Sequence, residues 1–394
     1  MNTKHFAGAL IATAALAGCD FGGGADTDAG VDSSLPLPDA NPSKVLACKT
    51  GTLLAGSPRY DGAPDSPASG SPLKGDPPLL WRGLSFDGNL VYTNTGEEVW
   101  YTDLSAPQPV QKRVTGAKGD AQSKDGACAD ARLTATFGQA VLPDHSLVVA
   151  DVQGNRLVKI TDPTGPACKV SHLAGVGKRA ADNMNDQDGP GKSAKISGPL
   201  WPVAAADGTI YFVDWDNKKV KKIAPGADAV VSTVASLKGS AIDDANSMVL
   251  RGDKLYLADN DFSNGIIVEI NPADGKVTTI FKGGGSAFDV EGAPVVMGLA
   301  TDGTRLFVSA KDQIFTINPD NTATLAAGAP REFEFPRNYD PTADHPAEEL
   351  VLLTSIGRST TAGANAFLTY QGDSLYYTGG VGNGIYVEKI TCPK

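Results

Sequence analysis

Histidine is scarce in this sequence, and its cysteines lack the spacing that holds zinc. The 394 residues include four histidines and five cysteines. Neither a CxxC pattern nor a cysteine–histidine cluster occurs, so nothing supports a zinc site. The GxSxG turn that presents a serine nucleophile in α/β-hydrolases is also absent. The sequence therefore has no motif for a zinc-dependent hydrolase or for a serine hydrolase of the α/β type.

Positive charge and long apolar runs are also in short supply. Lys and Arg number 34 against 45 Asp and Glu, which gives a formal net charge of −11. Because an acidic chain repels phosphate backbones, we expect no nucleic-acid partner. No apolar run reaches the roughly 20 residues that span a bilayer. Nothing of helical period and useful length occurs in residues 45–394.

The N-terminus has the features of an export signal. Lys4 precedes an apolar run over Phe6–Ala17, which has the length of a secretory signal core. The run ends in Leu16-Ala17-Gly18-Cys19, which resembles the lipobox of bacterial lipoproteins. This resemblance implies cleavage before Cys19 and acylation of Cys19. The alternative is a plain secreted protein in which this cysteine is accidental.

The chain divides into three predicted parts. Residues 1–18 form a lipoprotein signal peptide, and residues 19–44 form a lipidated flexible tether, because Gly, Asp, Ser and Pro dominate there. Residues 45–394 form the folded part. We expect a protein of the bacterial cell envelope, anchored to a membrane by lipid, with the folded part in the periplasm or at the cell surface. Asp20 fits the rule for inner-membrane retention in enteric bacteria, but that rule is not general.

One long segment of the folded part recurs without a gap. Residues 125–160 and 188–223 align throughout, with Asp151 opposite Asp214. Both contain short apolar runs bounded by Gly, Asn and Asp, which is the pattern of short β-strands. Weaker copies lie at Leu90–Leu104, Leu255–Ile270, Leu306–Ile317 and Leu375–Ile390. Six units of four strands predict an all-β fold, a six-bladed β-propeller.

The units resemble NHL repeats. The resemblance rests on the strand–Asp–x–x–Asn–Arg/Lys cores at Leu147–Ile160 and Ile210–Ile223, and on the lead-in at Leu173–Ala194. It covers roughly residues 79–394. The first, fifth and sixth units lack the aspartate, so their assignment rests on spacing and strand pattern. The resemblance implies four-stranded blades, with strands A to D from the axis outward.

A repeated phrase predicts how the ring closes. ACKTGTLLAG at Ala47–Gly56 returns as ACKVSHLAG at Ala167–Gly175, where it is strand D of the second unit. The last unit ends after strand C, at Cys392, and has no strand D. The N-terminal strand is therefore expected to complete the last blade, which removes an unpaired sheet edge.

Closure also bears on the cysteines. Without Cys19, four cysteines remain, and an even number in an exported chain indicates two disulfides. Three connectivities are possible. If the N-terminal strand lies beside the last strand C, Cys48 lies near Cys392, which leaves Cys128 to pair with Cys168.

The B–C turns and the blade-to-blade connections should share one face, which we call the loop face. It gathers acidic, amide and aromatic side chains, and the candidate partner-binding residues are Asp151, Asp214, Trp215, Asp216, Asn217, Asp259, Asn260 and Asp261. Together they could form a pocket for a cation or a polar ligand. The alternative is structural: each Asp caps its own turn by accepting backbone N–H groups.

Two classes of propeller enzyme need metal-binding residues that this sequence mostly lacks. Some NHL-like propellers are amidating lyases that hold a metal with several histidines. Here His145 is expected in an A–B turn and His172 on an outer strand. Only His345 could therefore reach the loop face at the mouth of the propeller's central channel. Lactonase-type propellers bind a divalent cation through Glu, Asn and Asp. The expected inner strands are mostly apolar, with Asn246 and Asn365 as the only nearby amides.

The leading hypothesis is a non-catalytic binding or scaffolding propeller that docks an envelope protein or glycan on its loop face. We expect a monomer without a cofactor. The alternative hypothesis is a divalent-cation-dependent hydrolase or lyase of the lactonase type, with calcium as the candidate ion.

Overall fold

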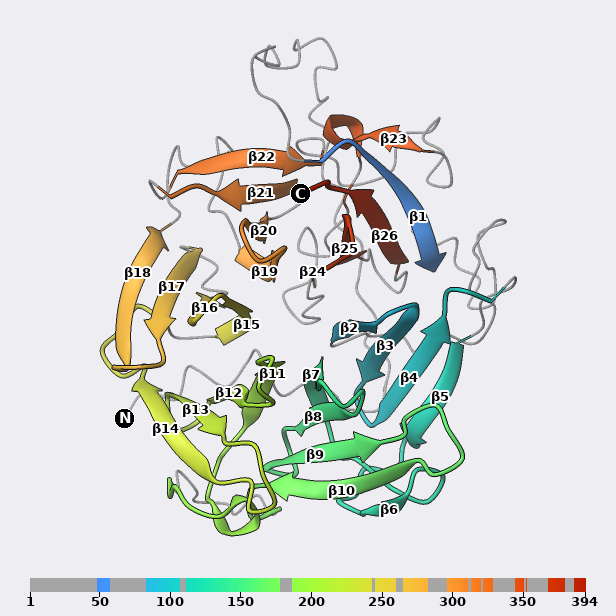
Figure 1. Ribbon diagram of the computed structural model, residues 1–394, viewed down its shortest axis with the longest axis vertical. Helices are drawn as coiled ribbons and strands as arrows, with labels where there is room; N and C mark the ends of the chain where they lie inside the picture. The colour runs from blue at the N-terminus through green and yellow to red at the C-terminus, as the bar shows by residue number, and fades with distance from the viewer. Residues whose placement is uncertain are drawn as a thin grey trace, which may run out of the picture.

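The computed structural model describes residues 48–56, 83–106, 111–177, 186–242, 245–259, 265–282, 296–310, 313–319, 322–328, 344–350, 352, 368–379 and 386–394. They form antiparallel sheets arranged as blades around an axis (Figure 1). The helices of this part are short 3₁₀ turns at Gly191–Ser193 and Ala347–Glu349. Among the described residues no helix has the length and apolar character needed to cross a membrane.

Six sheets make up the ring, which confirms the predicted six-bladed β-propeller. Blade 1 consists of β2 (Leu84–Asp87), β3 (Leu90–Thr95), β4 (Glu98–Asp103) and β5 (Gln111–Gly116). Blade 2 consists of β7 (Thr136–Val141), β8 (Leu147–Asp151), β9 (Arg156–Thr161) and β10 (Lys169–Ala174). Blade 3 consists of β11 (Pro199–Ala204), β12 (Ile210–Asp214), β13 (Lys219–Ile223) and β14 (Val231–Ser236).

The second half of the chain repeats this arrangement. Blade 4 consists of β15 (Ala245–Arg251), β16 (Lys254–Asp259), β17 (Ile266–Asn271) and β18 (Lys276–Lys282). Blade 5 consists of β19 (Val296–Thr301), β20 (Leu306–Ala310), β21 (Gln313–Ile317) and β22 (Ala323–Ala327). Blade 6 consists of β24 (Leu368–Gln371), β25 (Ser374–Gly379), β26 (Tyr386–Thr391) and β1 (Thr50–Gly56).

The N-terminal strand closes the ring, as the repeated phrase predicts. β1 pairs antiparallel with β26, from Thr50 opposite Thr391 to Gly56 opposite Tyr386. In Figure 1 the blue β1 lies beside the dark red β26 as the outer strand of blade 6. The closed ring therefore joins the first and last strands of the propeller within one sheet.

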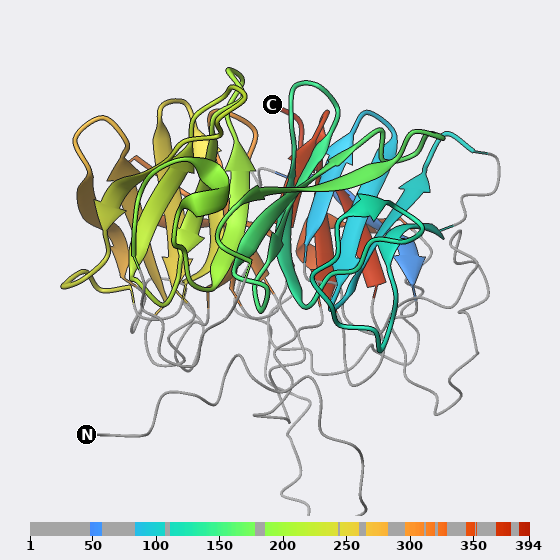
Figure 2. The same ribbon diagram turned by 90° about the horizontal axis from the view of Figure 1, so that it is seen from below.

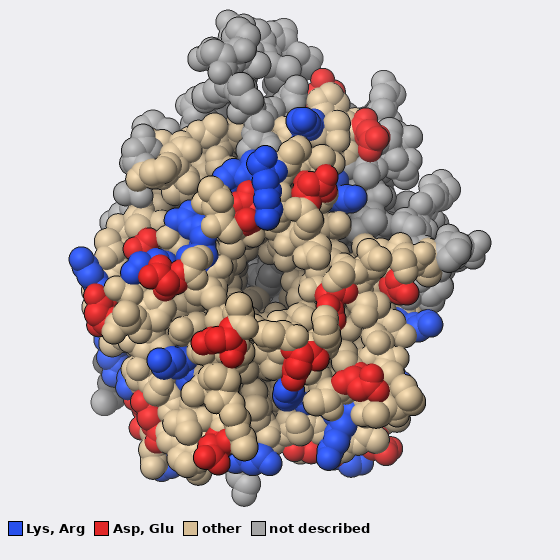
Figure 3. All heavy atoms as spheres, viewed as in Figure 1, with Lys and Arg blue, Asp and Glu red and all other residues tan. Residues whose placement is uncertain are grey.

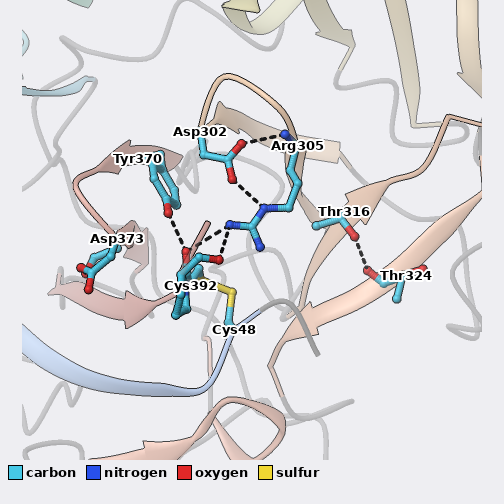
Figure 4. The surroundings of a disulfide bond; sticks show 10 residues. Cys48, Asp302, Arg305, Thr316, Thr324, Tyr370, Asp373 and Cys392 are labelled. Atoms are coloured by element: carbon cyan, nitrogen blue, oxygen red, sulfur yellow. Dashed lines mark hydrogen bonds and ion pairs between the residues drawn. A yellow bond between two sulfur atoms is a disulfide. The ribbon is translucent and has the colours of Figure 1, made fainter. Parts of the chain in front are cut away.

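A disulfide and an arginine hold the C-terminus at this closure. Cys48 and Cys392 form a disulfide with their Cα atoms 4.0 Å apart. Arg305, from blade 5, donates to the carbonyl oxygens of Cys392 at 3.1 Å and Pro393 at 2.7 Å (Figure 4). Tyr370 donates its hydroxyl to the Cys392 carbonyl at 2.6 Å. The last residues are thus fixed by blade 5 as well as by their own blade.

Two blades have a short fifth strand outside strand D, which the repeat pattern does not predict. β6 (Gly126–Ala127) pairs with β10 in blade 2, and β23 (His345–Pro346) pairs with β1 in blade 6. In blade 2 the second disulfide, Cys128–Cys168, ties this added strand to strand D with a Cα–Cα distance of 5.4 Å. Both disulfides are those expected from closure.

Apolar clusters fill the spaces between neighbouring blades. The described residues form five such clusters, one at each boundary from blade 1 to blade 6 along the chain. Phe212 lies in the cluster of blades 2 and 3, and Phe307 in that of blades 5 and 6; both are fully buried. At the boundary of blades 6 and 1, the rings of Phe86 and Tyr376 lie 4.3 Å apart. Because both sides of a blade are covered, its middle strands read as continuous apolar runs.

The antiparallel strands place the turns on two opposite faces (Figure 2). The A–B and C–D turns lie on one face, and the B–C turns and blade connections lie on the loop face. This separation decides which candidate residues can act together.

Candidate functional site

The strand-end aspartates of the loop face are buried. Asp151, Asp214 and Asp259 end strand B of blades 2, 3 and 4, and each side chain is fully inaccessible. Asn260 and Asp261 lie outside the described residues. The three buried aspartates therefore belong to the interior of the blades rather than to an open acidic pocket.

Asp151 joins strand B to the segment that leads into its blade. Its Oδ1 accepts the backbone N–H of Thr134 at 2.8 Å and of Ala135 at 3.2 Å, together with the Thr134 hydroxyl. Its Oδ2 accepts Nε of the buried Arg156 at 2.8 Å. Asp151 therefore has a structural role in a form that the sequence did not predict: its carboxylate accepts N–H groups of the lead-in, which passes beside the end of strand B.

Asp214 plays the same part in blade 3 with a different cation. Its Oδ1 accepts the Ser197 N–H at 2.7 Å, and both carboxylate oxygens accept Nδ2 of Asn217, the neighbouring candidate, at 3.1 and 2.9 Å. Lys221 Nζ lies 3.8 Å from Oδ2. Here too the backbone donor belongs to the lead-in rather than to the aspartate's own turn.

Burial raises the pKa of Asp214 to about 6, against the opposing effect of these hydrogen bonds and of Lys221. Lys221 is fully buried, which by itself lowers its pKa. Asp186 and Asp188, each 2.6 Å from Nζ, outweigh that effect and raise it. The lysine is therefore neutralised mainly by the lead-in carboxylates.

Trp215 and Asp216 are the described candidates of the loop face that remain partly exposed. They lie in the B–C turn of blade 3, whose backbone donates to the carbonyls of Gly198 and Ser197 at 3.3 and 3.2 Å. The Ser197 hydroxyl donates to Asp216 Oδ2 at 2.6 Å. Lys218 Nζ lies 3.7 Å from the centre of the Trp215 ring. The turn thus presents a fixed aromatic ring beside a carboxylate.

The histidines are distributed around the ring. His145 is in an A–B turn with Nδ1 2.9 Å from Asp87, and His172 is on the outer strand β10, both as predicted. The expectation that His345 could reach the channel mouth is wrong. His345 lies in β23, opposite Gly51 of β1 at the outer edge of blade 6. His345 lies there because the described segment 344–350 runs outside strand D of blade 6, where Pro346 lies opposite Thr50.

A cavity occupies the central channel and is lined by the inner strands of all six blades. Its volume is about 280 Å³, and a hollow marks it at the centre of the face of the A–B turns (Figure 3). Gln139 of β7 and Ser85 of β2 form part of its wall. None of the described lining residues carries a charged side chain.

Gln139 is not among the candidates predicted from the sequence, and an irregularity in its strand explains why. β7 begins at Thr136, and its pairing with β8 shifts register before Gln139. Gly138, with φ +79°, produces this irregularity and breaks the alternation of side chains. A similar shift in β11 surrounds Trp201, whose φ is +50°. Of the two amides named in the sequence, Asn246 is nearly buried, and Asn365 lies outside the described residues.

No protein-family model and no curated protein matches this chain. Among solved structures, it is similar to a protein of unknown function from Bacteroides thetaiotaomicron, with TM-score 0.55 and 12% identity over 87% of this chain and 75% of that one. An auxiliary nutrient binding protein from the same organism has TM-score 0.54 and 11% identity, covering 88% and 76%. A gluconolactonase from Xanthomonas campestris has TM-score 0.48 and 14% identity, covering 79% and 86%. At these identities the likeness shows the fold alone: the protein is a six-bladed β-propeller.

Proposed function

We propose that this protein is a lipid-anchored, non-catalytic binding propeller of the cell envelope that docks a protein or glycan on its loop face. The observation that carries the proposal is the B–C turn of blade 3, which holds Trp215 partly exposed on a rigid sheet. Aromatic residues that are fixed before binding lose little entropy on association, so they serve as interface anchors.

The buried aspartates favour binding over metal-assisted catalysis. Asp151 and Asp214 use their carboxylate oxygens for the lead-in N–H groups and for neighbouring side chains. A cation at these oxygens would compete with the bonds that hold the lead-ins and the neighbouring side chains in place. We therefore assign these carboxylates to the framework that supports the loop face.

Substitution of Trp215 tests the docking surface. Trp215→Ala should lower the affinity for a partner bound on the loop face by about 30-fold, because an aromatic anchor contributes about 2 kcal/mol or more to binding. Val230→Ala is the matched control, since Val230 is an exposed apolar residue of the same blade on the opposite face. In quantitative pull-downs from envelope extracts, the Trp215→Ala variant should lose partners that the wild type captures, and the Val230→Ala variant should keep them. Identical partner profiles for wild type and Trp215→Ala would contradict the proposal.

The anchor has its own test. Replacing Cys19 with Ser should move the protein from the membrane fraction to the soluble fraction, because the acyl chains supply the membrane affinity. Retention of the variant in membranes until detergent is added would contradict lipidation at Cys19.

The lactonase-type hypothesis predicts a different result. If the wild-type protein cleaves lactones in the presence of calcium, and chelation abolishes the cleavage, catalysis replaces binding as the function.

A further inference from the structure

The channel wall contains a polar pair, Gln139 and Ser85, whose hydrogen-bonding groups are only partly satisfied by the described residues. Gln139 is 8% exposed, and its Nε2 donates to Ser85 Oγ across the boundary of blades 1 and 2 at 3.1 Å. Its Oε1 is buried and accepts no hydrogen bond from any of the described residues. A buried acceptor without a donor costs about 1–3 kcal/mol, so such atoms in native proteins have a reason, often a water or a ligand.

The hydrogen bond that does form sets the chemistry of the pair. Because Ser85 Oγ accepts from Gln139, the Ser85 hydroxyl proton is left to donate to another group. Gln139 Oε1 supplies an acceptor beside that donor. A hydroxyl group both donates and accepts, so adjacent hydroxyls of one molecule match this pair.

Glycines bring the pair together. A Cβ on Gly138 would lie 3.0 Å from Cα of Trp201 in the next blade, and Gly138 has φ +79°. A Cβ on Gly83, just before β2, would lie 3.2 Å from Cα of Gly138 in blade 2. Only glycine at these two positions lets the inner strands of blades 1, 2 and 3 approach closely enough for β2 and β7 to share a hydrogen bond.

Charge around the cavity selects against ions. Its described wall holds no charged side chain, so a cation or anion inside would be desolvated without a counter-ion. Figure 3 shows both acidic and basic residues around the hollow on the face of the A–B turns. Two of the aspartates on this face are paired with cations, Asp144 with Lys159 and Asp302 with Arg305, so the selection against ions rests on the uncharged wall.

We infer that the end of the channel near the A–B turns binds a small, neutral, polyhydroxylated molecule of monosaccharide size, with Gln139 and Ser85 bonding its hydroxyls. The volume of about 280 Å³ lies just below the range of about 300–1,000 Å³ for pockets of drug-sized ligands, which fits a single sugar unit. This site is separate from the loop face and does not depend on a partner there.

Calorimetric titration with neutral sugars tests the inference. D-glucose, D-galactose and N-acetyl-D-glucosamine are the probes, and D-gluconate is the anionic comparison. At least one neutral sugar should bind saturably with Kd below about 10 mM, and D-gluconate should bind more weakly. Gln139→Met, which keeps the length but removes the acceptor, should weaken binding by about tenfold or more.

Gln122→Met is the matched control, because Gln122 is an exposed glutamine outside the cavity, and it should bind as the wild type does. If Gln139→Met fails to fold, Ser85→Ala removes the donor instead and should cause a loss of similar size. Three results would each overturn the inference: no saturable binding of any neutral sugar, equal or tighter binding of D-gluconate, or unchanged affinity in the folded channel variant.

Discussion

Blades 2 and 6 have the same phrase in strand D but use its cysteine differently. In both, strand D pairs with strand C on one side and with a short added strand on the other. In blade 2, Cys168 bonds outward to Cys128, just after the added strand. In blade 6, Cys48 bonds inward to Cys392, at the end of strand C.

A shift of one residue explains the difference. Lys169 lies opposite Thr161 in blade 2, and Thr50 lies opposite Thr391 in blade 6, so Lys49 rather than Cys48 occupies the position of Cys168. Backbone bonds agree, because Lys49 O accepts from Ala347 as Cys168 O accepts from Cys128. Successive residues of a strand point to opposite sides, so the shift turns Cys48 to the other side. Cys168 secures an added strand, and Cys48 joins the two ends of the propeller.

Removal of β1 should produce the largest effect. Deletion of residues 45–56 leaves β26 as an unpaired edge and exposes the outer face of blade 6, so the protein should unfold or aggregate. Deletion of residues 20–40, in the predicted tether, is the control and should leave the melting temperature unchanged. Equal stability of the two truncations would remove the case for closure by the N-terminus.

Removal of each disulfide should show which of the two contributes more to the free energy of unfolding. The loop-entropy relation gives about 6 kcal/mol for Cys48–Cys392, with a sequence separation of 344, and about 4 kcal/mol for Cys128–Cys168, with a separation of 40. Both figures are upper values. Denaturant unfolding of the two double Cys→Ser variants should show the greater loss for Cys48 and Cys392. The reverse order would mean that closure depends on the strand pairing alone.

Blade 3 should contribute a pH-dependent stability that blade 6 lacks, because of the aspartate at the end of its strand B. Blade 3 has Asp214 where blade 6 has Gly379. The folded-state pKa of Asp214 is raised to about 6, so its stabilising contribution is complete below pH of about 4 and is lost as the pH rises through 6. Relative to Asp214→Asn, the free energy of unfolding of the wild type should fall by up to about 3 kcal/mol between pH 4 and 7. A pH-independent difference between the two proteins would contradict a raised pKa.

The lead-in aspartates should produce the smallest difference. Asp125 accepts from Arg156 at 2.7 Å and from the His172 N–H at 2.8 Å. Asp344 precedes β23 as Asp125 precedes β6, but it is exposed, and no described residue bonds its side chain. Asp125→Ala should cost about 1–2 kcal/mol and Asp344→Ala less than about 0.5 kcal/mol in thermal unfolding. Equal costs would show that Asp344 also fastens its blade.

Much of the fold could be predicted from the sequence because its signals are local or repeated. The strands of blades 2 and 3 align without a gap, and the phrase ACK…LAG marks both strands D. The lead-in to blade 6 was not recognised: Asp344–Leu350 has the same 3₁₀ turn after proline as Asp188–Ala194, but only the Asp and the Pro are shared.

The candidate sites were harder to predict, because their partners are distant in sequence. The bonds from Asp151 and Asp214 to the lead-ins span 17 residues. Gln139 and Ser85 are 54 residues apart and meet only when two blades pack. The irregularity at Gly138 also conceals which side chains of β7 face the channel.

Peptide mapping without reduction tests closure by the N-terminal strand most directly. Digestion of the folded protein, followed by mass spectrometry, should recover a peptide with Cys48 linked to a peptide with Cys392, and Cys128 linked to Cys168. Cys48 linked to Cys128 or Cys168 would contradict the closure described here.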